Sequence, residues 1–527
     1  MPYYKDVRDH IKALEANDKL TRVKREINKD TELMPLVRWQ FRGLTEEKRK
    51  AFLFENAIDV KGKRYDSSVL VAAHAASKEV YALAMMCEPE EIQGKWDEAR
   101  SHPIKPSMTT RGVCQEEVHI GQNILEHGGV TEFPVPLSTP GFDNAPYITA
   151  PLWVSKDPET GVTNVGTYRA MVKSPDRLGI RIEQGQDLRQ HWDKCRSLGR
   201  PLEAALVVGT IPSIGLVSVT KFPYGIDEYT IAGGISGEPV ELVKCKTVDI
   251  EVPATAEIVI EGHILTDSLE REGPFGEYSG YVYACELSPY FNISCITHRK
   301  HPVYVAFISE LPPSESSKLK MIATQADIHR VLKARGIDVV EVAFHEASGA
   351  VLFLVISIKK AYNPQAWQAL KIADAYSVIM GKIIIVVDDD INPSDLDQVL
   401  WAVSFRMQPH RDVLIVPGEE VALDPSAGPP DAEIPSGHVS LPTSAMLLDA
   451  TRKWDYPPVS LPARQFMERA KEIWEEEGFP ELKPKPPWYG YSLGNWPKKL
   501  QEEAELALKG DHFQTGKKLA EEERTDL

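Results

Sequence analysis

The chain is organised around residues 269–281, which read LEREGPFGEYSGY. The Gly273-Pro274 pair interrupts the backbone there, because proline fixes its own φ and pushes the preceding residue out of the helical region. A glycine two positions further on gives the chain a second point at which it can bend or approach another group closely. On an unbroken strand, Glu272 and Glu277 would point to opposite faces, since successive side chains alternate. The interruption therefore lets two carboxylates converge on one pocket, an arrangement suited to proton transfer.

The residues after the interruption alternate in a second pattern. Glu277, Ser279 and Tyr281 are spaced two apart, which predicts an extended segment with all three side chains on one face. The competing interpretation is a solvated hairpin tip, because charged turns beside strands commonly have no chemical role.

Length and composition predict a soluble, acidic, globular protein that acts on small molecules. A chain of 527 residues is too long for one core of ordinary size and divides into two to four units. Hydrophobic residues make up 43% and charged residues 26%, and the formal net charge of -17 repels nucleic acid and anionic lipid. We therefore expect neither a nucleic-acid partner nor a membrane partner.

Cysteine usage and the N-terminal segment predict a cytoplasmic protein. The six cysteines show no C-x-x-C spacing, which argues against a zinc site and is typical of free thiols in a reducing compartment. The first 19 residues are charged throughout, without the apolar stretch of a secretory signal. No run of residues approaches the roughly 20 apolar positions that a membrane span needs.

The chain changes character along its length in a way that predicts domains. Residues 1–115 form an N-terminal α/β region, in which the apolar run 68–73 is typical of a buried strand or helix end. Residues 116–312 contain one helix, 188–198, among short β-rich segments separated by proline and glycine, at a spacing typical of a barrel or sandwich. These expected strands are 147–149, 152–154, 205–208, 216–219, 258–260, 281–283 and 291–293.

The second half predicts a linking helix, an α/β domain and a tail. Residues 313–336 form the linking helix, and residues 337–455 alternate strands with helices. One helix is expected to open at Asn363-Pro364 and close at Gly381, and another is expected to open at Asn392-Pro393. The strands expected there are 338–342, 350–355, 383–387 and 413–416.

Residues 456–527 form a tail of helix-like stretches around the aromatic segment 486–491, which we expect to pack on a neighbouring subunit. A monodisperse monomer that is unchanged when residues 457–527 are deleted would rule this out.

Three segments of the middle region carry polar groups suited to a phosphate and a cation. Asn164 precedes Arg169, Asp187 precedes His191 by four residues, and Glu228 follows a Tyr-Gly-Ile-Asp turn. Amide and carboxylate oxygens suit a hard cation such as Mg²⁺ or Mn²⁺, which often bridges to a cofactor phosphate. Taken singly, each residue is equally well explained as a surface polar group.

Residues 269–281, together with Asn164-Val165-Gly166-Thr167-Tyr168-Arg169, closely resemble the signature of the UbiD family of prenylated-FMN-dependent decarboxylases. The resemblance spans most of residues 1–455. It implies a multi-domain α/β fold in which a split β-barrel cofactor domain is flanked by α/β domains, and an assembly as a homo-oligomer, either dimer or hexamer. It also implies a flavin prenyltransferase as the supplier of the cofactor.

The resemblance assigns roles to the polar residues. It implies that Asn164, Arg169 and Glu228 bind the cofactor, with a divalent metal, Mn²⁺ or Mg²⁺, and a monovalent cation, K⁺ or Na⁺, nearby. Asn164 and Glu228 match two of the family's metal ligands. The family's third metal ligand is a histidine. Counting without gaps from Arg169, the matching position here is Asp187, and His191, one helical turn later, is the alternative ligand.

The family's catalytic arginine between two glutamates is matched by Arg169, Glu272 and Glu277. The resemblance implies a carboxy-lyase of aromatic compound metabolism. Decarboxylation leaves a carbanion, so an electron sink and a proton donor are needed, and Glu277 is the expected donor.

The expected reaction is a reversible, non-oxidative decarboxylation of an aromatic or α,β-unsaturated acid, presented free or as a coenzyme A thioester. Side chains near residues 443–446 are expected to finish its pocket. Two alternatives remain at this point. A flavin oxidoreductase would need a nicotinamide site, but no G-x-G-x-x-G motif opens a helix. A non-catalytic assembly subunit would not need the three charged residues.

Overall fold

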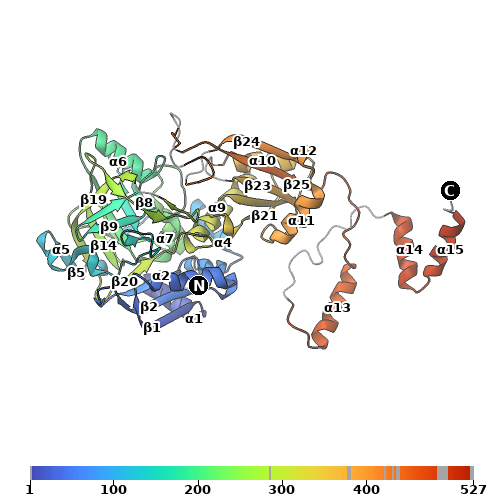
Figure 1. Cartoon of the computed structure of the whole chain (residues 1–527), viewed down its shortest axis with the longest axis horizontal. Helices are drawn as coiled ribbons and strands as arrows, with labels where there is room; N and C mark the ends of the chain where they lie inside the picture. The colour runs from blue at the N-terminus through green and yellow to red at the C-terminus, as the bar shows by residue number, and fades with distance from the viewer. Residues whose placement is uncertain are drawn as a thin grey trace.

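The computed structural model places an α/β layer, a large antiparallel sheet and a second α/β domain in succession, followed by an extended tail (Figure 1). It describes residues 3–283, 286–349, 351–376, 381–419, 423–429, 432–434, 440–482 and 497–522. No helix in these ranges is long and apolar enough to cross a membrane.

The N-terminal layer is a four-stranded sheet covered by helices. Its order is β1-β2-β3-β20, so its last strand comes from a segment more than 200 residues further along the chain. The apolar run after residue 67, for which a buried strand or a helix end was expected, forms strand β3. The strands are β1 (Leu20–Asn28), β2 (Ala51–Ile58), β3 (Ser68–Val71) and β20 (Val303–Ala306), and the helices are α1 (Val7–Ala16), α2 (Leu33–Gly43), η1 (Glu46–Lys48), α3 (Lys78–Ala84) and α4 (Ile92–Ser101).

The middle region is built on a nine-stranded antiparallel sheet, which curls into a half-barrel and confirms the predicted combination of a split barrel with α/β layers. Its order is β6-β9-β10-β19-β14-β11-β7-β8, and β5 pairs with β19. The strands are β5 (Glu117–Ile120), β6 (Tyr147–Ile148), β7 (Leu152–Lys156), β8 (Thr163–Thr167), β9 (Ala170–Ser174), β10 (Arg177–Ile180), β11 (Leu202–Val208), β14 (Ile258–Ile264) and β19 (Tyr290–His298).

Short helices and strand pairs cover this sheet. The helices are η2 (Val113–Gln115), α5 (Gln122–Glu126), η3 (Gly129–Glu132), α6 (Asp187–Ser197), α7 (Pro212–Ser218) and α8 (Glu228–Ser236). The small sheets join β4 (Ser107–Met108), β12 (Glu241–Lys244) and β13 (Glu251–Pro253), then β15 (Glu270–Glu272) with β18 (Glu286–Ser288), and β16 (Phe275–Gly276) with β17 (Val282–Tyr283).

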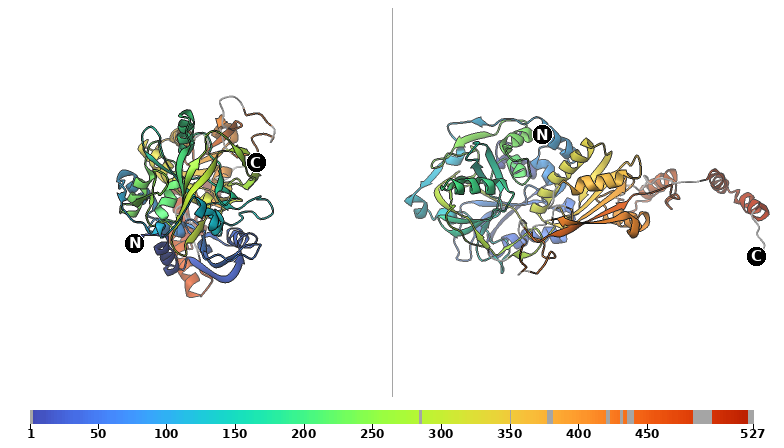
Figure 2. Two further views of the ribbon diagram at one scale, coloured as in Figure 1. Left: turned by 90° about the vertical axis from the view of Figure 1, so that its left-hand side faces the viewer. Right: turned by 90° about the horizontal axis from the view of Figure 1, so that it is seen from above.

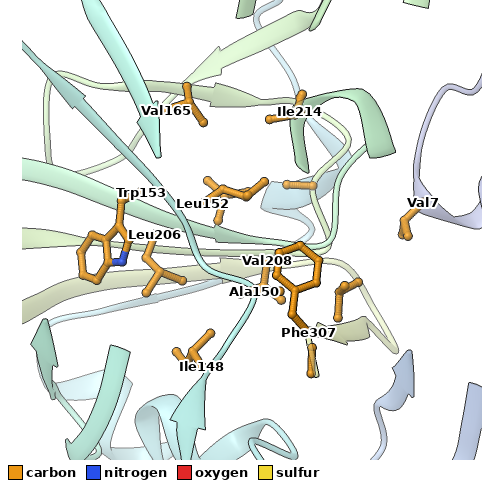
Figure 3. Packing of buried hydrophobic residues seen from close by; sticks show 14 of the residues in the cluster. Val7, Ile148, Ala150, Leu152, Trp153, Val165, Leu206, Val208, Ile214 and Phe307 are labelled. Atoms are coloured by element: carbon orange, nitrogen blue, oxygen red, sulfur yellow. The ribbon is translucent and has the colours of Figure 1, made fainter. Parts of the chain in front are cut away.

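One continuous cluster of buried apolar side chains joins the N-terminal layer to the large sheet. Trp153 and Leu206, from paired strands, both belong to it (Figure 3). The ring of Trp153 also meets that of Phe291 edge to face, at 5.0 Å between ring centroids. Phe307 and Val7 belong to the same cluster. The first two regions are therefore packed as one body, which gives the site a rigid support.

The strand expected at residues 216–219 is wrong, because these residues lie in or directly after α7. Proline occupies the first turn of that helix, where its missing N–H is tolerated, and all of the helix's side chains are buried. A helix that is apolar all round has no polar face, so a short apolar run cannot distinguish it from a buried strand.

The C-terminal domain is a five-stranded sheet of order β21-β22-β23-β25-β24. Side chains on β22 and β23 alternate between two cores, with Leu354 and Ile384 on one face and Val355 and Ile385 on the other. The strands are β21 (Val339–Phe344), β22 (Phe353–Ile358), β23 (Ile383–Asp388), β24 (Val413–Glu419) and β25 (Thr443–Ala450), and the helices are α9 (Glu315–Ala334), η4 (Glu346–Ser348), α10 (Gln365–Asp374), α11 (Leu396–Arg406) and α12 (Pro409–Asp412).

Two expected helix boundaries in this domain differ from the structure. The helix expected to open at Asn392-Pro393 begins only at Leu396, with Asp395 as its N-cap. The helix expected from Asn363 to Gly381 runs only from Gln365 to Asp374, and the Asn363 amide donates to the Lys453 carbonyl instead of capping the helix. Residues 443–446, expected to finish the pocket, open β25, which the sequence reading did not identify.

The tail extends away from the rest of the molecule (Figures 1 and 2). It contains α13 (Arg464–Glu476), α14 (Lys498–Leu508) and α15 (His512–Glu522), and the first two bury no residue. The aromatic segment 486–491 lies outside the described residues. Contact of the tail with a neighbouring subunit stays a prediction.

Candidate active site

The interruption at Gly273-Pro274 separates two short strands, as predicted. β15 ends at Glu272 and β16 begins at Phe275, and Gly273 has a φ of 95°, a conformation that favours glycine. The Gly273 N–H donates to the Tyr147 hydroxyl at 3.1 Å, and its carbonyl accepts from the Asn144 amide at 3.0 Å. These bonds fix the turn that carries the two carboxylates.

Arg169 joins both carboxylates predicted for the site. It lies in the connection between β8 and β9, where its Nε donates to Glu272 Oε1 at 2.9 Å and its Nη2 to Glu272 Oε2 at 2.5 Å. The remaining terminal nitrogen, Nη1, pairs with Glu277. The Glu272 side chain is 1% exposed and that of Glu277 15%. A bidentate pair of this kind fixes the guanidinium plane as well as its charge.

Glu277 reaches Arg169 from a turn, and the extended segment expected after it is wrong. The Glu277 N–H donates to the Tyr281 carbonyl, and the Gly280 N–H donates to the Glu277 carbonyl, both at 2.9 Å. Gly280 has a φ of 90°, which lets the chain reverse between β16 and β17. Tyr281 is 59% exposed, so the expected common face does not form.

Burial and neighbouring charges shift the pKa values of Glu277 and Arg169 in opposite directions. Burial raises the pKa of Glu277, against the lowering effect of Arg169 and Arg181. Burial also lowers the pKa of Arg169, but Glu277 and Glu272 outweigh it, and the net direction is upward. Arg169 therefore stays charged, and Glu277 holds its proton to a higher pH than an exposed glutamate does.

Two aromatic rings border the guanidinium. The Arg169 guanidinium carbon lies 4.8 Å from the centroid of Phe275 and 5.9 Å from that of Tyr147. The two rings are 4.4 Å apart. Aromatic faces stabilise a cation and offer a flat apolar wall.

Two further acids near the site were not found from sequence. Burial raises the pKa of Asp143 to about 6 and that of Glu310 to about 8, and Glu310 pairs with Arg38. A Cβ added at Gly276 would lie 2.7 Å from the Glu310 side chain, so Glu310 packs against the strand before Glu277. Its φ of 65° is unusual for a residue with a side chain and marks a constrained position. No local motif in the sequence signals either residue.

The candidate cation-binding residues meet around a buried tyrosine. Asn164 lies on β8, while Asp187 and Glu228 are the first residues of α6 and α8. Burial raises the pKa of the Tyr168 hydroxyl, and the charges of Asp187 and Glu228 raise it further, because both carboxylates lie close by. The Asn164 side chain lies beside the same hydroxyl. The fold therefore brings together three oxygen-bearing side chains from separate elements.

The donor set has the properties expected of a hard-cation site. Asn164 is buried and offers an amide oxygen, and the buried Asp187 and Glu228 offer carboxylate oxygens. Burial raises the pKa of Glu228 to about 8, and its Oε2 accepts from the Val165 N–H at 2.8 Å. Such a group is costly to ionise without a counter-ion, and a divalent cation would supply one. The residues present fit the metal that the resemblance implies.

Asp187 and His191, the two candidates for the third metal ligand, have different hydrogen-bond partners. Asp187 Oδ1 accepts from Lys221 Nζ at 2.7 Å. His191 Nδ1 lies 2.9 Å from the Ser155 hydroxyl, and burial lowers the pKa of its ring to about 4, so the imidazole is neutral. Both side chains are buried on α6.

Comparison with known proteins identifies the family. Residues 107–312 match the 3-octaprenyl-4-hydroxybenzoate carboxy-lyase Rift-related domain, and residues 319–450 match the C-terminal domain of the same carboxy-lyase. An uncharacterized protein of Aquifex aeolicus is 32% identical, over 90% of this chain and 99% of its own. One from Archaeoglobus fulgidus is 30% identical, over 90% of this chain and 98% of its own.

Solved structures agree with the sequence matches. An evolved dimeric form of the UbiD-class enzyme HmfF from Pelotomaculum thermopropionicum, in complex with prFMN, is 31% identical with a TM-score of 0.76, over 89% of this chain and 100% of that one. Vanillic acid decarboxylase of Sedimentibacter hydroxybenzoicus is 27% identical with a TM-score of 0.76, over 90% of this chain and 100% of that one. The chain therefore belongs to the UbiD family of prenylated-FMN-dependent decarboxylases and is a UbiD-class carboxy-lyase.

Proposed function

We propose that the substrate is an aromatic or α,β-unsaturated carboxylic acid, taken free or as its coenzyme A thioester, and that the reaction is its reversible, non-oxidative decarboxylation. The observation that carries this proposal is the buried Arg169 held between Glu272 and Glu277 against two aromatic rings. A cation beside a flat apolar wall suits a planar acid with one carboxylate. The vanillic acid and 3,4-dihydroxybenzoic acid decarboxylases among the related structures act on acids of this kind.

Prenylated FMN, when bound, supplies the electron sink for the electron pair that stays on the substrate carbon when CO₂ leaves. Arg169 binds the substrate carboxylate, and Glu272 holds the guanidinium in the orientation that this requires. Glu277 donates its proton to the carbon that has lost CO₂ and is reprotonated from solvent. In the direction of carboxylation, the Glu277 carboxylate removes that proton.

Asn164, Asp187 and Glu228 would hold the divalent metal, Mn²⁺ or Mg²⁺, which would supply positive charge for the phosphate of the cofactor. A monovalent cation, K⁺ or Na⁺, would bind close to this group, and a flavin prenyltransferase would supply the cofactor. Oxygen ligands, including two carboxylates, support a hard cation that bridges to a phosphate.

The third ligand can be assigned by a matched pair of variants on α6. Asp187→Asn is expected to weaken Mn²⁺ binding at least about tenfold, because it removes an anionic ligand. His191→Asn removes the neutral ring that contacts Ser155 and is expected to leave Mn²⁺ affinity within about threefold of wild type. Metal content and Mn²⁺ titration of the two proteins provide the readout. The reverse order of effects would assign the ligand to His191.

The direction of the Glu277 pKa shift predicts the pH profile of decarboxylation. Glu277 is active as a donor only when protonated, and burial raises its pKa, so the active form persists below that raised pKa and is lost above it. The kcat for decarboxylation is therefore expected to fall about tenfold per pH unit on the alkaline side. A kcat that rises with pH through the same range would contradict the assignment of Glu277 as the acid.

A substrate screen tests the proposed function. The chain is co-expressed with a flavin prenyltransferase, and CO₂ release is measured with a panel of aromatic and unsaturated acids and their coenzyme A thioesters. Release from one subset, matched by a product lacking the carboxylate, is the expected result. Absence of CO₂ with substrate-dependent oxidation of NAD(P)H would favour a flavin oxidoreductase, and binding without turnover would favour an assembly subunit.

A further inference from the structure

A second cluster of metal-ligating side chains lies at the opposite end of the large sheet from Arg169. His119 is on β5, His127 directly follows α5, Glu132 ends η3 and His298 ends β19. The labels β5 and α5 mark this edge of the molecule in Figure 1. Tyr290, at the other end of β19, is aligned through β10 with Met171, two residues after Arg169. The length of β19 separates the two places by about 25 Å.

The strand pairing brings the two buried histidines together. His119 is paired with Ile296 across β5 and β19, which places it diagonally beside His298, with ring centroids 5.2 Å apart. The ring of His127 stacks on that of His119 at 3.9 Å. The potential ligand atoms of His119, His127 and Glu132 all lie within 4.8 Å of one another.

Both oxygens of Glu132 face a histidine nitrogen. Its Oε2 lies 3.3 Å from His119 Nδ1, and its Oε1 lies 3.6 Å from His298 Nε2. A tetrahedral site with bonds of about 2.0–2.1 Å has ligand atoms about 3.3–3.4 Å apart. The separation between His119 Nδ1 and Glu132 Oε2 is close to that value.

The facing atoms are buried and lack hydrogen bonds. Within the described part of the chain, His119 Nδ1, His298 Nε2 and Glu132 Oε2 have no hydrogen-bond partner. His298 Nδ1 lies 2.9 Å from the Arg299 carbonyl, which can only accept, so this nitrogen carries the hydrogen.

The carboxylate of Glu132 supplies the negative charge that a dication needs.

We propose that His119, His127 and Glu132 form a second metal site, which binds a transition-metal dication of the Zn²⁺ type. Two imidazoles and one carboxylate suit Zn²⁺, whereas the oxygen-rich group at Asn164 and Glu228 suits Mg²⁺ or Mn²⁺. His298 faces the second oxygen of the Glu132 carboxylate and lies beside the site. The site ties the segment of residues 121–132 to β5, and its role is structural, because it lies far from Arg169.

The test uses the full-length chain, stripped with a chelator and kept in excess Mg²⁺ so that the oxygen-rich site is filled. Zn²⁺ is titrated in competition with a chromophoric chelator, and Co²⁺ is added separately as a spectroscopic probe. Wild type is expected to bind one Zn²⁺ and to give the intense visible absorption of tetrahedral Co²⁺. Bound Zn²⁺ is also expected to raise the melting temperature.

His127→Ala is the main variant, because the ring of His127 is exposed and its loss is expected to leave the fold intact. It is expected to weaken Zn²⁺ binding at least about tenfold and to reduce the Co²⁺ absorption. Glu132→Gln keeps the size of the side chain and is expected to have the same effect. His410→Ala removes an exposed histidine on α12 and serves as the matched control, with wild-type Zn²⁺ affinity expected.

Equal Zn²⁺ affinity and stoichiometry in wild type, His127→Ala and Glu132→Gln would overturn the proposal. So would a wild-type protein that binds no Zn²⁺ in excess Mg²⁺, since the cluster would then hold only protons. Neither readout depends on flavin or turnover. Failure of this site and failure of the proposed decarboxylation are therefore distinguishable.

Discussion

Glu277→Gln is expected to lower kcat by roughly 10²–10⁴-fold while the cofactor stays bound. Glutamine keeps the size of the side chain but has no acidic proton to deliver. Because Glu277 contacts Arg169 and none of the groups around Tyr168, its replacement should leave the cofactor's phosphate site unchanged. The measurement is CO₂ release by the variant holoenzyme, with the flavin content determined on the same sample.

Glu286→Gln is the matched control for this variant. Glu286 lies opposite Glu272 in the small sheet of β15 and β18, but its side chain is 57% exposed and pairs only loosely with Arg181, at 3.5 Å. Its replacement is expected to leave kcat within about twofold. Decarboxylation at the wild-type rate by Glu277→Gln would remove Glu277 from the role of proton donor.

Glu228→Gln and Asn164→Ala are expected to yield protein that folds but retains little cofactor. Glu228→Gln keeps an acceptor for the Val165 N–H and removes the charge, so a loss of binding reports on the cation and not on the helix. Loss of one ligand is expected to weaken the metal at least about 10–100-fold, and the phosphate held through it with the metal. Flavin absorbance and metal content of the purified proteins provide the readout.

Asp227→Asn tests whether such a loss could come from the start of α8 alone. Asp227 caps that helix by accepting from the Tyr229 N–H at 3.0 Å, next to Glu228 in the chain. Asparagine is also a good cap, so this variant is expected to retain the cofactor. Full cofactor in Glu228→Gln, or equal loss in both variants, would contradict the assignment of Glu228 as a ligand.

The parts of the site that sequence predicted depend on local signals. The Gly273-Pro274 interruption shows where β15 must end, and the segment of Asn164 to Arg169 gives the second half of the constellation. Both were found because each is carried by a few neighbouring residues. The folded sheet then brings Arg169 between the two carboxylates.

The parts that sequence missed depend on distant neighbours. Glu310 reaches the site only because Arg38 and the strand before Glu277 pack against it, and Asp143 has no distinguishing motif. The sequence pattern of helix α7 predicts a strand, because a helix that is buried on all sides lacks the amphipathic period that identifies a helix.

The histidine cluster shows the same limit in another way. His119 and His298 are nearly 180 residues apart and meet only through the pairing of β5 with β19. The absence of C-x-x-C spacing, which argued against a zinc site, bears on thiolate ligands alone. Imidazole ligands need no such spacing, and only the fold shows that the ligand atoms of His119, His127 and Glu132 meet.

The central claim is that this fold binds prenylated FMN through a hard cation and uses it for decarboxylation. The most direct measurement is the mass of the cofactor released from wild-type chain co-expressed with a flavin prenyltransferase, together with the Mn²⁺ and Mg²⁺ content. The account predicts prenylated FMN and one such cation in equal amounts. Unmodified FMN, or no flavin at all despite an active prenyltransferase, would contradict it.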